Sequence, residues 1–280
     1  MDSLVSTQWL ADELGAGDLR LLDASWHLPD AKRDAAADYA EAHIPGALYL
    51  NLGALVDPQA PLENTVPDAV DFANAMQALG LGEGRRVVVY DDSAVKSAAR
   101  AWFLLRLFGV RDVAILDGGL GKWKAEGRLL ASGEETLPYR HFVARAEPSR
   151  LRSKSEVLAN LSSIAEQVVD ARGPARFAGS DPEPRPSVSP GHIPGSCNVP
   201  YGSLFAPDGT YKDPPDLRAA FARAGIDLSR PVIATCGSGI TACVLIFALH
   251  LLGKDDVAFY DGSWAEWGTD PDTPKVLGAA

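Results

Sequence analysis

The sequence has few cysteines and no surplus of basic residues, and each shortage excludes a class of protein. Its 280 residues include three cysteines, Cys197, Cys236 and Cys243, which lack the spacing of a disulfide framework or of a Cys/His metal site. Acidic residues outnumber basic ones by 37 to 26, for a net charge of −11. This balance provides no basic stripe for nucleic acid. We therefore expect a reducing compartment and no nucleic-acid partner.

Long apolar runs and a basic leader are also missing. The longest apolar segment, over 241–252, is shorter than the roughly 20 residues that a membrane-spanning helix needs. The first ten residues lack the basic start and apolar core of a signal peptide. The hydrophobic fraction of 46% is ordinary for a globular protein. These features predict a cytoplasmic protein without membrane contact.

Strand and helix patterns alternate along the chain. Ser6 is a candidate N-cap for the first helix, and glycines end several of the later ones. Helices are expected over 6–14, 68–79, 98–108 and 241–252, and strands over 19–23, 86–90, 113–116 and 232–234. This alternation favours parallel sheets covered by helices on both faces, an α/β fold.

The pattern occurs twice. Five landmarks recur in the same order and at nearly constant separation, which indicates an internal duplication. The pairs are 21–23 with 168–170, 43–46 with 192–195, 86–91 with 231–236, 107–109 with 251–253, and 117–123 with 261–267. We predict an N-terminal domain over 1–136, a linker over 137–153 and a C-terminal domain over 154–280.

Cys236 lies just after the expected strand 232–234. It is followed by Gly237-Ser-Gly239 and an apolar helix. Backbone N–H groups at such a strand-to-helix junction stabilise negative charge on a sulfur and on a group attached to it. Cys236 is therefore the candidate nucleophile, whereas Cys197 and Cys243 are interpreted as packing residues. The paired position in the first half holds Asp91, so we expect one active site per chain and a structural or interface role for Asp91.

These motifs give the chain a family resemblance. It resembles tandem-domain sulfurtransferases of the rhodanese superfamily, and most closely their 3-mercaptopyruvate sulfurtransferase branch. The resemblance covers nearly the whole chain and implies two rhodanese-like domains, of which the second is catalytic. It is carried by residues 22–26, 43–46 and 116–119 of the first half, and by 169–172, 176–179, 182–185, 191–195, 236–241 and 261–264 of the second.

The resemblance also implies roles for individual residues. Arg176 and Arg185 would bind the carboxylate of the donor, because guanidinium groups match carboxylates. A relay of Ser238, His43 and Asp34 would assist proton transfer. His43 has a counterpart in His192, so a structural turn in both halves is an open alternative. The loop residues Gly237, Gly239, Ile240 and Thr241 would line the substrate site.

The implied reaction moves sulfur from 3-mercaptopyruvate to a thiol such as thioredoxin or glutathione, or to cyanide, through a persulfide on Cys236. Pyruvate is released, and no metal or organic cofactor is expected. A loop without a cation favours this donor over thiosulfate. Thiosulfate:cyanide sulfurtransferase activity and a non-catalytic persulfide carrier are the alternatives. Some phosphatases use a loop in which a cysteine is followed, after five residues, by an arginine that holds the phosphoryl group. The residue at that position here is Ala242, so a phosphatase is disfavoured.

Overall fold

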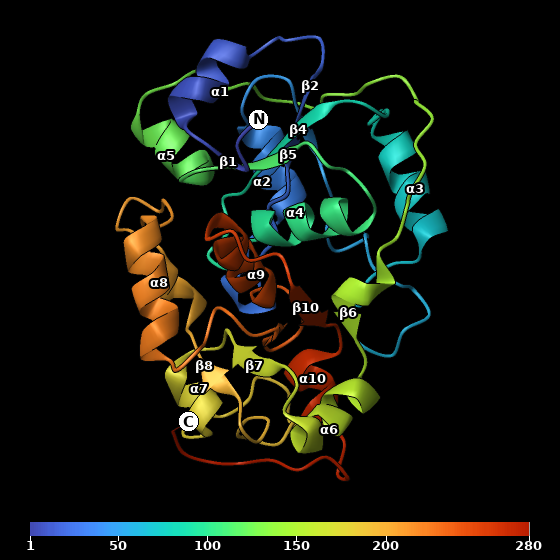
Figure 1. Cartoon of the computed structure of the whole chain (residues 1–280). Helices are drawn as coiled ribbons and strands as arrows, with labels where there is room; N and C mark the ends of the chain where they lie inside the picture. The colour runs from blue at the N-terminus through green and yellow to red at the C-terminus, as the bar shows by residue number, and fades with distance from the viewer. Residues whose placement is uncertain (280) are drawn as a thin grey trace. The chain divides into compact units, whose positions relative to one another are not determined.

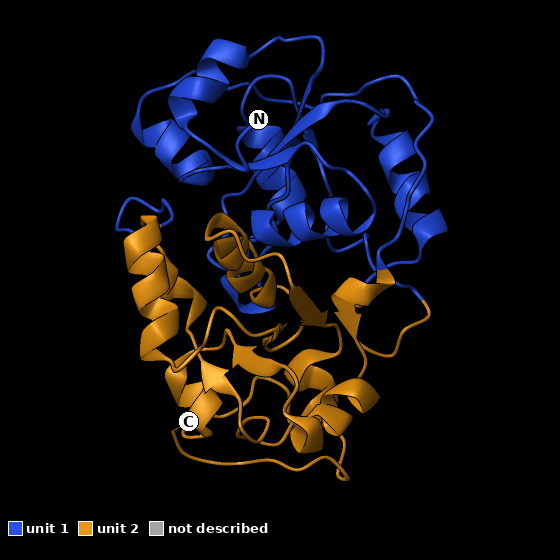
Figure 2. Ribbon diagram, viewed as in Figure 1, with its two compact units in different colours: residues 1–58, 66–147, 206–211 blue, residues 59–65, 148–205, 212–280 orange. Residues whose placement is uncertain are grey.

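The computed structural model describes residues 1–279 and divides them into two compact units (Figure 2). Unit 1 contains Met1–Pro58, Val66–Glu147 and Ala206–Tyr211. Unit 2 contains Gln59–Thr65, Pro148–Phe205 and the chain from Lys212 onward.

Unit 1 is built on a sheet of five parallel strands in the order β1-β5-β4-β2-β3 (Figure 1). The strands are β1 (Leu4–Val5), β2 (Leu19–Asp23), β3 (Ala47–Tyr49), β4 (Arg86–Tyr90) and β5 (Val113–Leu116). The helices are α1 (Thr7–Glu13), α2 (Ala35–Glu41), α3 (Ala69–Ala78), α4 (Ala98–Leu107) and α5 (Gly119–Ala125). The expected α/β class is confirmed.

Helices cover both faces of this sheet because successive connections move toward opposite edges of the sheet. The step from β2 to β3 runs one way, and the steps from β3 to β4 and from β4 to β5 run the other way. Right-handed crossovers then place α2 on the opposite face from α3 and α4. One face buries Leu10 of α1 and Trp123 of α5 against Val88 and Tyr90 of the central strand β4.

Unit 2 repeats this topology with the strand order β6-β10-β9-β7-β8. Its strands are β6 (Leu151–Arg152), β7 (Gln167–Asp170), β8 (Cys197–Asn198), β9 (Val232–Thr235) and β10 (Val257–Tyr260). Its helices are α6 (Lys154–Ser163), α7 (Pro174–Ala178), α8 (Pro214–Arg223), α9 (Ala242–Leu251) and α10 (Ser263–Trp267). The matching strand orders agree with the duplication inferred from the sequence.

The short edge strands were not predicted. β1, β3, β6 and β8 contain two or three residues each, which is too few to show a hydrophobic period. The longer elements agree well with expectation: β4 and β5 have the predicted bounds, and the Ser6 side chain accepts a hydrogen bond from the Trp9 N–H at the start of α1.

The repeated His-Ile-Pro-Gly turn has the same construction in both units. The Nδ1 atom of His43 lies 2.8 Å from the Tyr39 carbonyl, and its ring stacks on Tyr39 with centroids 4.2 Å apart. His192 forms the equivalent contacts with Phe177, at 2.9 Å and 3.9 Å. Both histidines therefore hold a turn against the helix before it.

The residues expected to form a linker, 137–153, are divided between the two units. The N–H groups of Arg145 and Glu147 donate to the carbonyls of Phe108 and Leu107, and Phe142 is buried, so residues up to Glu147 belong to unit 1. β6 joins the sheet of unit 2 through β10. The chain therefore passes from unit 1 to unit 2 between residues 147 and 148. In addition, 59–65 belongs to unit 2 and 206–211 to unit 1.

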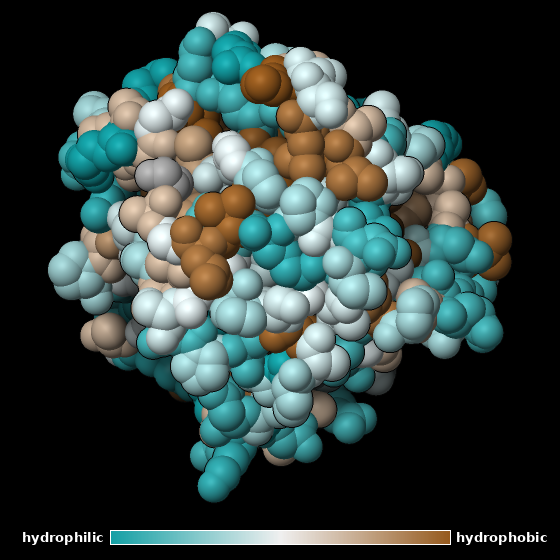
Figure 3. All heavy atoms as spheres, turned by 90° about the horizontal axis from the view of Figure 1, so that it is seen from below, coloured by the Kyte–Doolittle hydropathy of each residue, from teal (hydrophilic) through white to brown (hydrophobic). Residues whose placement is uncertain are grey.

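Exposed apolar side chains are few in comparison with the buried core. In unit 2 the large ones are Leu158, Ile164, Val276 and Leu277. On the face shown in Figure 3, hydrophobic residues form separate groups between hydrophilic ones. Within residues 1–279, no helix is long and apolar enough to cross a bilayer.

The packing of 137–147 on unit 1 can be tested with two neighbouring substitutions. Phe142 is 6% exposed and lies 6.0 Å from Phe72 between ring centroids, whereas Val143 is 40% exposed. Phe142→Ala should lower the free energy of unfolding by about 3 kcal/mol because it leaves a cavity. Val143→Ala should change it by less than about 0.5 kcal/mol. Urea unfolding measures both, and equal effects would contradict the packing described.

Candidate active site

Cys236 directly follows the central strand of unit 2. β9 lies between β10 and β7, and the chain leaves these strands in opposite directions, toward β10 from β9 and toward β8 from β7. In open parallel sheets, ligands bind beyond the carboxyl ends of the strands at such a point. The fold thus places the candidate nucleophile at the expected position for a ligand site.

The loop after Cys236 wraps around its sulfur. The N–H of Gly239 donates to Sγ at 3.1 Å. Gly239 has φ +89°, and a Cβ atom there would lie 3.3 Å from the Phe259 ring and 3.6 Å from the Asp261 carbonyl. Glycine is needed at this position for both its backbone conformation and its lack of a side chain.

Helix α10 fixes the other side of the loop. The N–H groups of Trp264 and Ala265 donate to the carbonyls of Cys236 and Gly237 at 2.9 and 2.8 Å. The Ser263 hydroxyl accepts a hydrogen bond from the Cys236 N–H at 3.3 Å and lies 4.0 Å from Sγ. Ser263 lies in the segment 261–264 that carries the family resemblance, but no local pattern in the sequence predicts its contact with Cys236.

Arg176 lies over the loop and is held by buried carboxylates. One of its Nη atoms is 3.3 Å from the position that a Cβ atom on Gly237 would occupy. Arg176 donates to Glu183, which is 5% exposed and also accepts a bond of 2.8 Å from Arg172. Arg172 in turn donates to the buried Asp170 at the end of β7. This chain of charges fixes one predicted substrate arginine beside the cysteine loop.

Two residues that the sequence interpretation missed contact the other predicted groups. Glu63 pairs with Arg185, and the Asn64 side-chain amide donates to the Ser238 hydroxyl at 3.4 Å. Both come from the segment 59–65, which was assigned to the first domain but belongs to unit 2. Pairing across a long sequence separation leaves no local pattern, so no sequence signal pointed to these contacts.

Ile240 and Thr241 lead into the first turn of α9. Their carbonyls accept hydrogen bonds from the N–H groups of Cys243 and Val244 at 3.2 and 3.1 Å. Their predicted contact with substrate stays a prediction. Cys243 is fully buried, with Sγ 3.7 Å from the Gly239 carbonyl.

Cys197, on the edge strand β8, is only partly buried. Burial raises the pKa of its thiol, which disfavours the thiolate. The packing role expected for Cys197 and Cys243 agrees with both environments.

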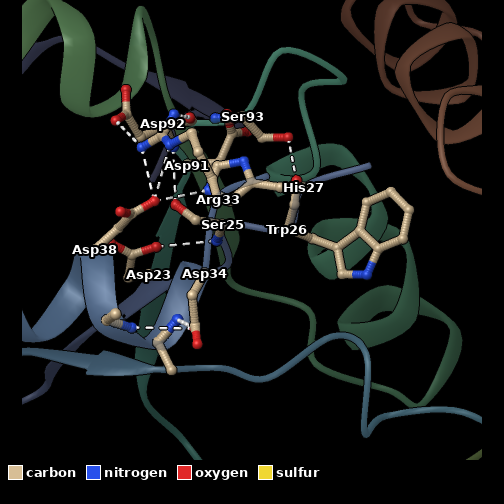
Figure 4. Close-up of polar contacts among 12 residues, drawn as sticks. Asp23, Ser25, Trp26, His27, Arg33, Asp34, Asp38, Asp91, Asp92 and Ser93 are labelled. Atoms are coloured by element: carbon tan, nitrogen blue, oxygen red, sulfur yellow. Dashed lines mark hydrogen bonds and ion pairs between the residues drawn. The ribbon is translucent and has the colours of Figure 1, made fainter. Parts of the chain in front are cut away.

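His43 and Asp34, two members of the relay that the resemblance implies, each form local hydrogen bonds in unit 1. Asp34 is the N-cap of α2, and its carboxylate accepts from the N–H groups of Ala36 and Ala37 (Figure 4). The His43 Nδ1 atom is engaged with Tyr39, and Nε2 has no hydrogen-bond partner among residues 1–279. These local bonds use the Asp34 carboxylate and the His43 Nδ1 atom, and the chemical role expected for the two residues stays a prediction.

Asp91 takes the place of the cysteine in unit 1. Its carboxylate accepts a hydrogen bond from the N–H group of Ser93 at 2.9 Å (Figure 4). It also accepts one from the N–H group of Ala98 at 2.7 Å, at the start of α4. The side chain therefore fills the junction that Cys236 occupies in unit 2. Burial raises the pKa of Asp91 to about 6 despite these two bonds. These contacts give Asp91 the structural role that the sequence indicated.

The chain is similar in sequence and in fold to known sulfurtransferases. The rhodanese-like domain model matches residues 6–126 and 153–270. The chain is 42% identical to mouse 3-mercaptopyruvate sulfurtransferase over 271 residues, covering 95% of this chain and 91% of that protein. It is 41% identical to bovine thiosulfate sulfurtransferase over 272 residues, with the same coverage. The crystal structure of the 3-mercaptopyruvate sulfotransferase SseA from Escherichia coli superposes with a TM-score of 0.87 at 37% identity, covering 94% of this chain and 99% of that one.

The chain therefore belongs to the rhodanese family, with two rhodanese-like domains in tandem. It is a sulfurtransferase enzyme of the mercaptopyruvate and thiosulfate type.

The buried Asp91 predicts a pH dependence of stability. Its carboxyl binds a proton at higher pH in the folded state, with a pKa of about 6 against 3.8 for an ordinary aspartate. Stability should therefore increase as the pH falls through this window. Asp91→Asn, which cannot titrate, provides the reference. The unfolding free energy of the wild type relative to this variant should rise by about 2 kcal/mol between about pH 7 and about pH 4.5. A constant difference would show that the pKa of Asp91 is not raised.

Proposed function

We propose that the enzyme transfers sulfur from 3-mercaptopyruvate to a thiol or cyanide acceptor through a persulfide on Cys236, with release of pyruvate. One observation carries this proposal: the Cys236 loop contains no charged side chain, while two arginines stand outside it. This arrangement fits a donor whose carboxylate lies at a distance from its sulfur, because the sulfur can reach the uncharged loop while the carboxylate binds the arginines.

In the first step the Cys236 thiolate attacks the thiol sulfur of the donor. A sulfur–sulfur bond forms, the donor carbon–sulfur bond breaks, and its electrons leave on carbon as the enolate of pyruvate. The enolate takes a proton to become pyruvate. The backbone N–H groups of the loop, of which Gly239 already faces Sγ, would then stabilise the charge of the persulfide.

The arginines would orient the donor. Arg176 lies beside Gly237, and its charge is held in place by Glu183. Planar guanidinium groups can bind a carboxylate and a neighbouring keto oxygen through paired hydrogen bonds. Ser238 lies two residues beyond the nucleophile and would donate its hydroxyl proton toward the departing carbon or the keto oxygen.

In the second step an acceptor takes the outer sulfur. A thiol such as thioredoxin or glutathione, or cyanide, attacks the persulfide and regenerates the Cys236 thiolate. The donor product leaves before the acceptor reacts, so ping-pong kinetics are expected.

Thiosulfate:cyanide sulfurtransferase activity is the second candidate. It is favoured by the 41% identity to bovine thiosulfate sulfurtransferase, which is nearly the same as the identity to the mercaptopyruvate relatives. Parallel assays with the two donors at equal concentration distinguish these activities. A persulfide carrier without turnover would release no pyruvate in the steady state.

Cys236→Ser should abolish steady-state pyruvate release, because a hydroxyl cannot form the persulfide. Cys197→Ser is the matched control, since Cys197 lies on an edge strand and its thiol pKa is raised by burial. The control should keep at least about half of the wild-type rate. Pyruvate release by folded Cys236→Ser at a comparable rate would refute the assignment of the nucleophile.

Arg185→Ala should raise the KM for 3-mercaptopyruvate by about ten- to a hundredfold. This range corresponds to the binding free energy that is lost with a hydrogen bond to a charged group. The KM for thiosulfate should change much less. Arg230→Ala removes an exposed arginine of the same unit and should leave both constants unchanged. Equal losses with the two donors would remove the reason for calling Arg185 a carboxylate-binding group.

A further inference from the structure

The segment Gln59–Thr65 contacts two groups that the proposed function uses. It lies in the first half of the sequence but is part of unit 2. Glu63 forms an ion pair with Arg185, and Asn64 donates to the Ser238 hydroxyl. One short segment thus reaches both the predicted carboxylate-binding arginine and the cysteine loop.

Asn64 anchors this segment on the loop. Its backbone is left-handed, with φ 60°, a conformation that asparagine tolerates better than most residues. Its side chain is buried, and its carbonyl lies 3.7 Å from the position that a Cβ atom on Gly239 would occupy. The backbone beside Glu63 is therefore held at a defined place against the cysteine loop.

The two arginines differ in how firmly their carboxylate partners are held. Glu183, the partner of Arg176, is 5% exposed and is shared with the buried Arg172. Glu63, the partner of Arg185, is 70% exposed, and Arg185 itself is 36% exposed. An exposed ion pair is weak and salt-sensitive, so another carboxylate can displace it. The carboxylate that binds Arg176 is therefore buried, whereas the one that binds Arg185 is open to solvent.

We propose that Glu63 is an internal competitor that occupies Arg185 until the carboxylate of a donor displaces it. This inference rests on the proposed role of Arg185. The donor carboxylate takes the place of the Glu63 carboxylate on the guanidinium, and Glu63 turns toward solvent. No covalent bond changes. Glu63 thereby sets the affinity for donors that carry a carboxylate.

The test is Glu63→Gln, which keeps the size of the side chain and removes its charge. The KM for 3-mercaptopyruvate should fall by about two- to fivefold, as expected for the loss of a weak competing pair, with kcat unchanged. The decrease should become smaller at high salt. The KM for thiosulfate, which has no carboxylate, should change by less than about twofold. Asp181→Asn is the control, because it removes an exposed negative charge in the same unit and should leave both constants unchanged.

A double-mutant cycle separates this inference from the proposed function. In the Arg185→Ala background, Glu63→Gln should have no further effect on the KM for 3-mercaptopyruvate. The same decrease there, or in Asp181→Asn, would show a general charge effect and overturn the competitor role. An unchanged or higher KM in Glu63→Gln alone would also overturn it, since Glu63 would then be neutral or would position Arg185. If Arg185→Ala itself does not select against 3-mercaptopyruvate, the proposed role of Arg185 fails first.

Discussion

Backbone N–H groups at the junction of a strand and a helix require an acceptor, and this requirement shapes the corresponding loop in both units. In unit 1 the Asp91 carboxylate accepts two of these N–H groups and closes the loop upon itself. In unit 2 the N–H of Gly239 points at the Cys236 sulfur. The same topology thus holds a carboxyl group in one unit and the sulfur of the candidate nucleophile in the other. We propose that the Cys236 junction carries the chemistry, while the Asp91 junction has a structural role.

The cysteine loop has no charged side chain, and we therefore propose that residues outside it select the donor. The loop glycines are needed for close approach, both around the sulfur at Gly239 and under the Arg176 guanidinium at Gly237. Arg176 is fixed by a buried carboxylate, whereas Arg185 has an exposed partner in Glu63. A rigid charge and an exchangeable charge would together hold a donor with a carboxylate at one end. The proposed exchange at Arg185 would then tune affinity without altering the chemical step.

The sequence predicted the elements whose signals are local. The duplicated order of strands, the position of Cys236 at the end of β9 and the structural replacement by Asp91 all follow from patterns within a few residues. Edge strands of two or three residues were missed because they are too short to show a period. The contacts of Glu63 and Asn64 with unit 2 were missed because they join residues more than a hundred positions apart. The roles of His43 and Asp34 in proton transfer stay predictions, although a turn and a helix cap already use the His43 Nδ1 atom and the Asp34 carboxylate.

The central claim is that Cys236 takes the sulfur of 3-mercaptopyruvate and keeps it until an acceptor arrives. A single-turnover experiment tests this directly: the enzyme is mixed with an equal amount of 3-mercaptopyruvate, without any acceptor, and pyruvate and the mass of the peptide containing Cys236 are measured. The account predicts a rapid release of pyruvate in equal amount to the enzyme, with one sulfur atom added at Cys236. Absence of this release, or pyruvate release with the added sulfur on Cys197 or Cys243, would contradict it.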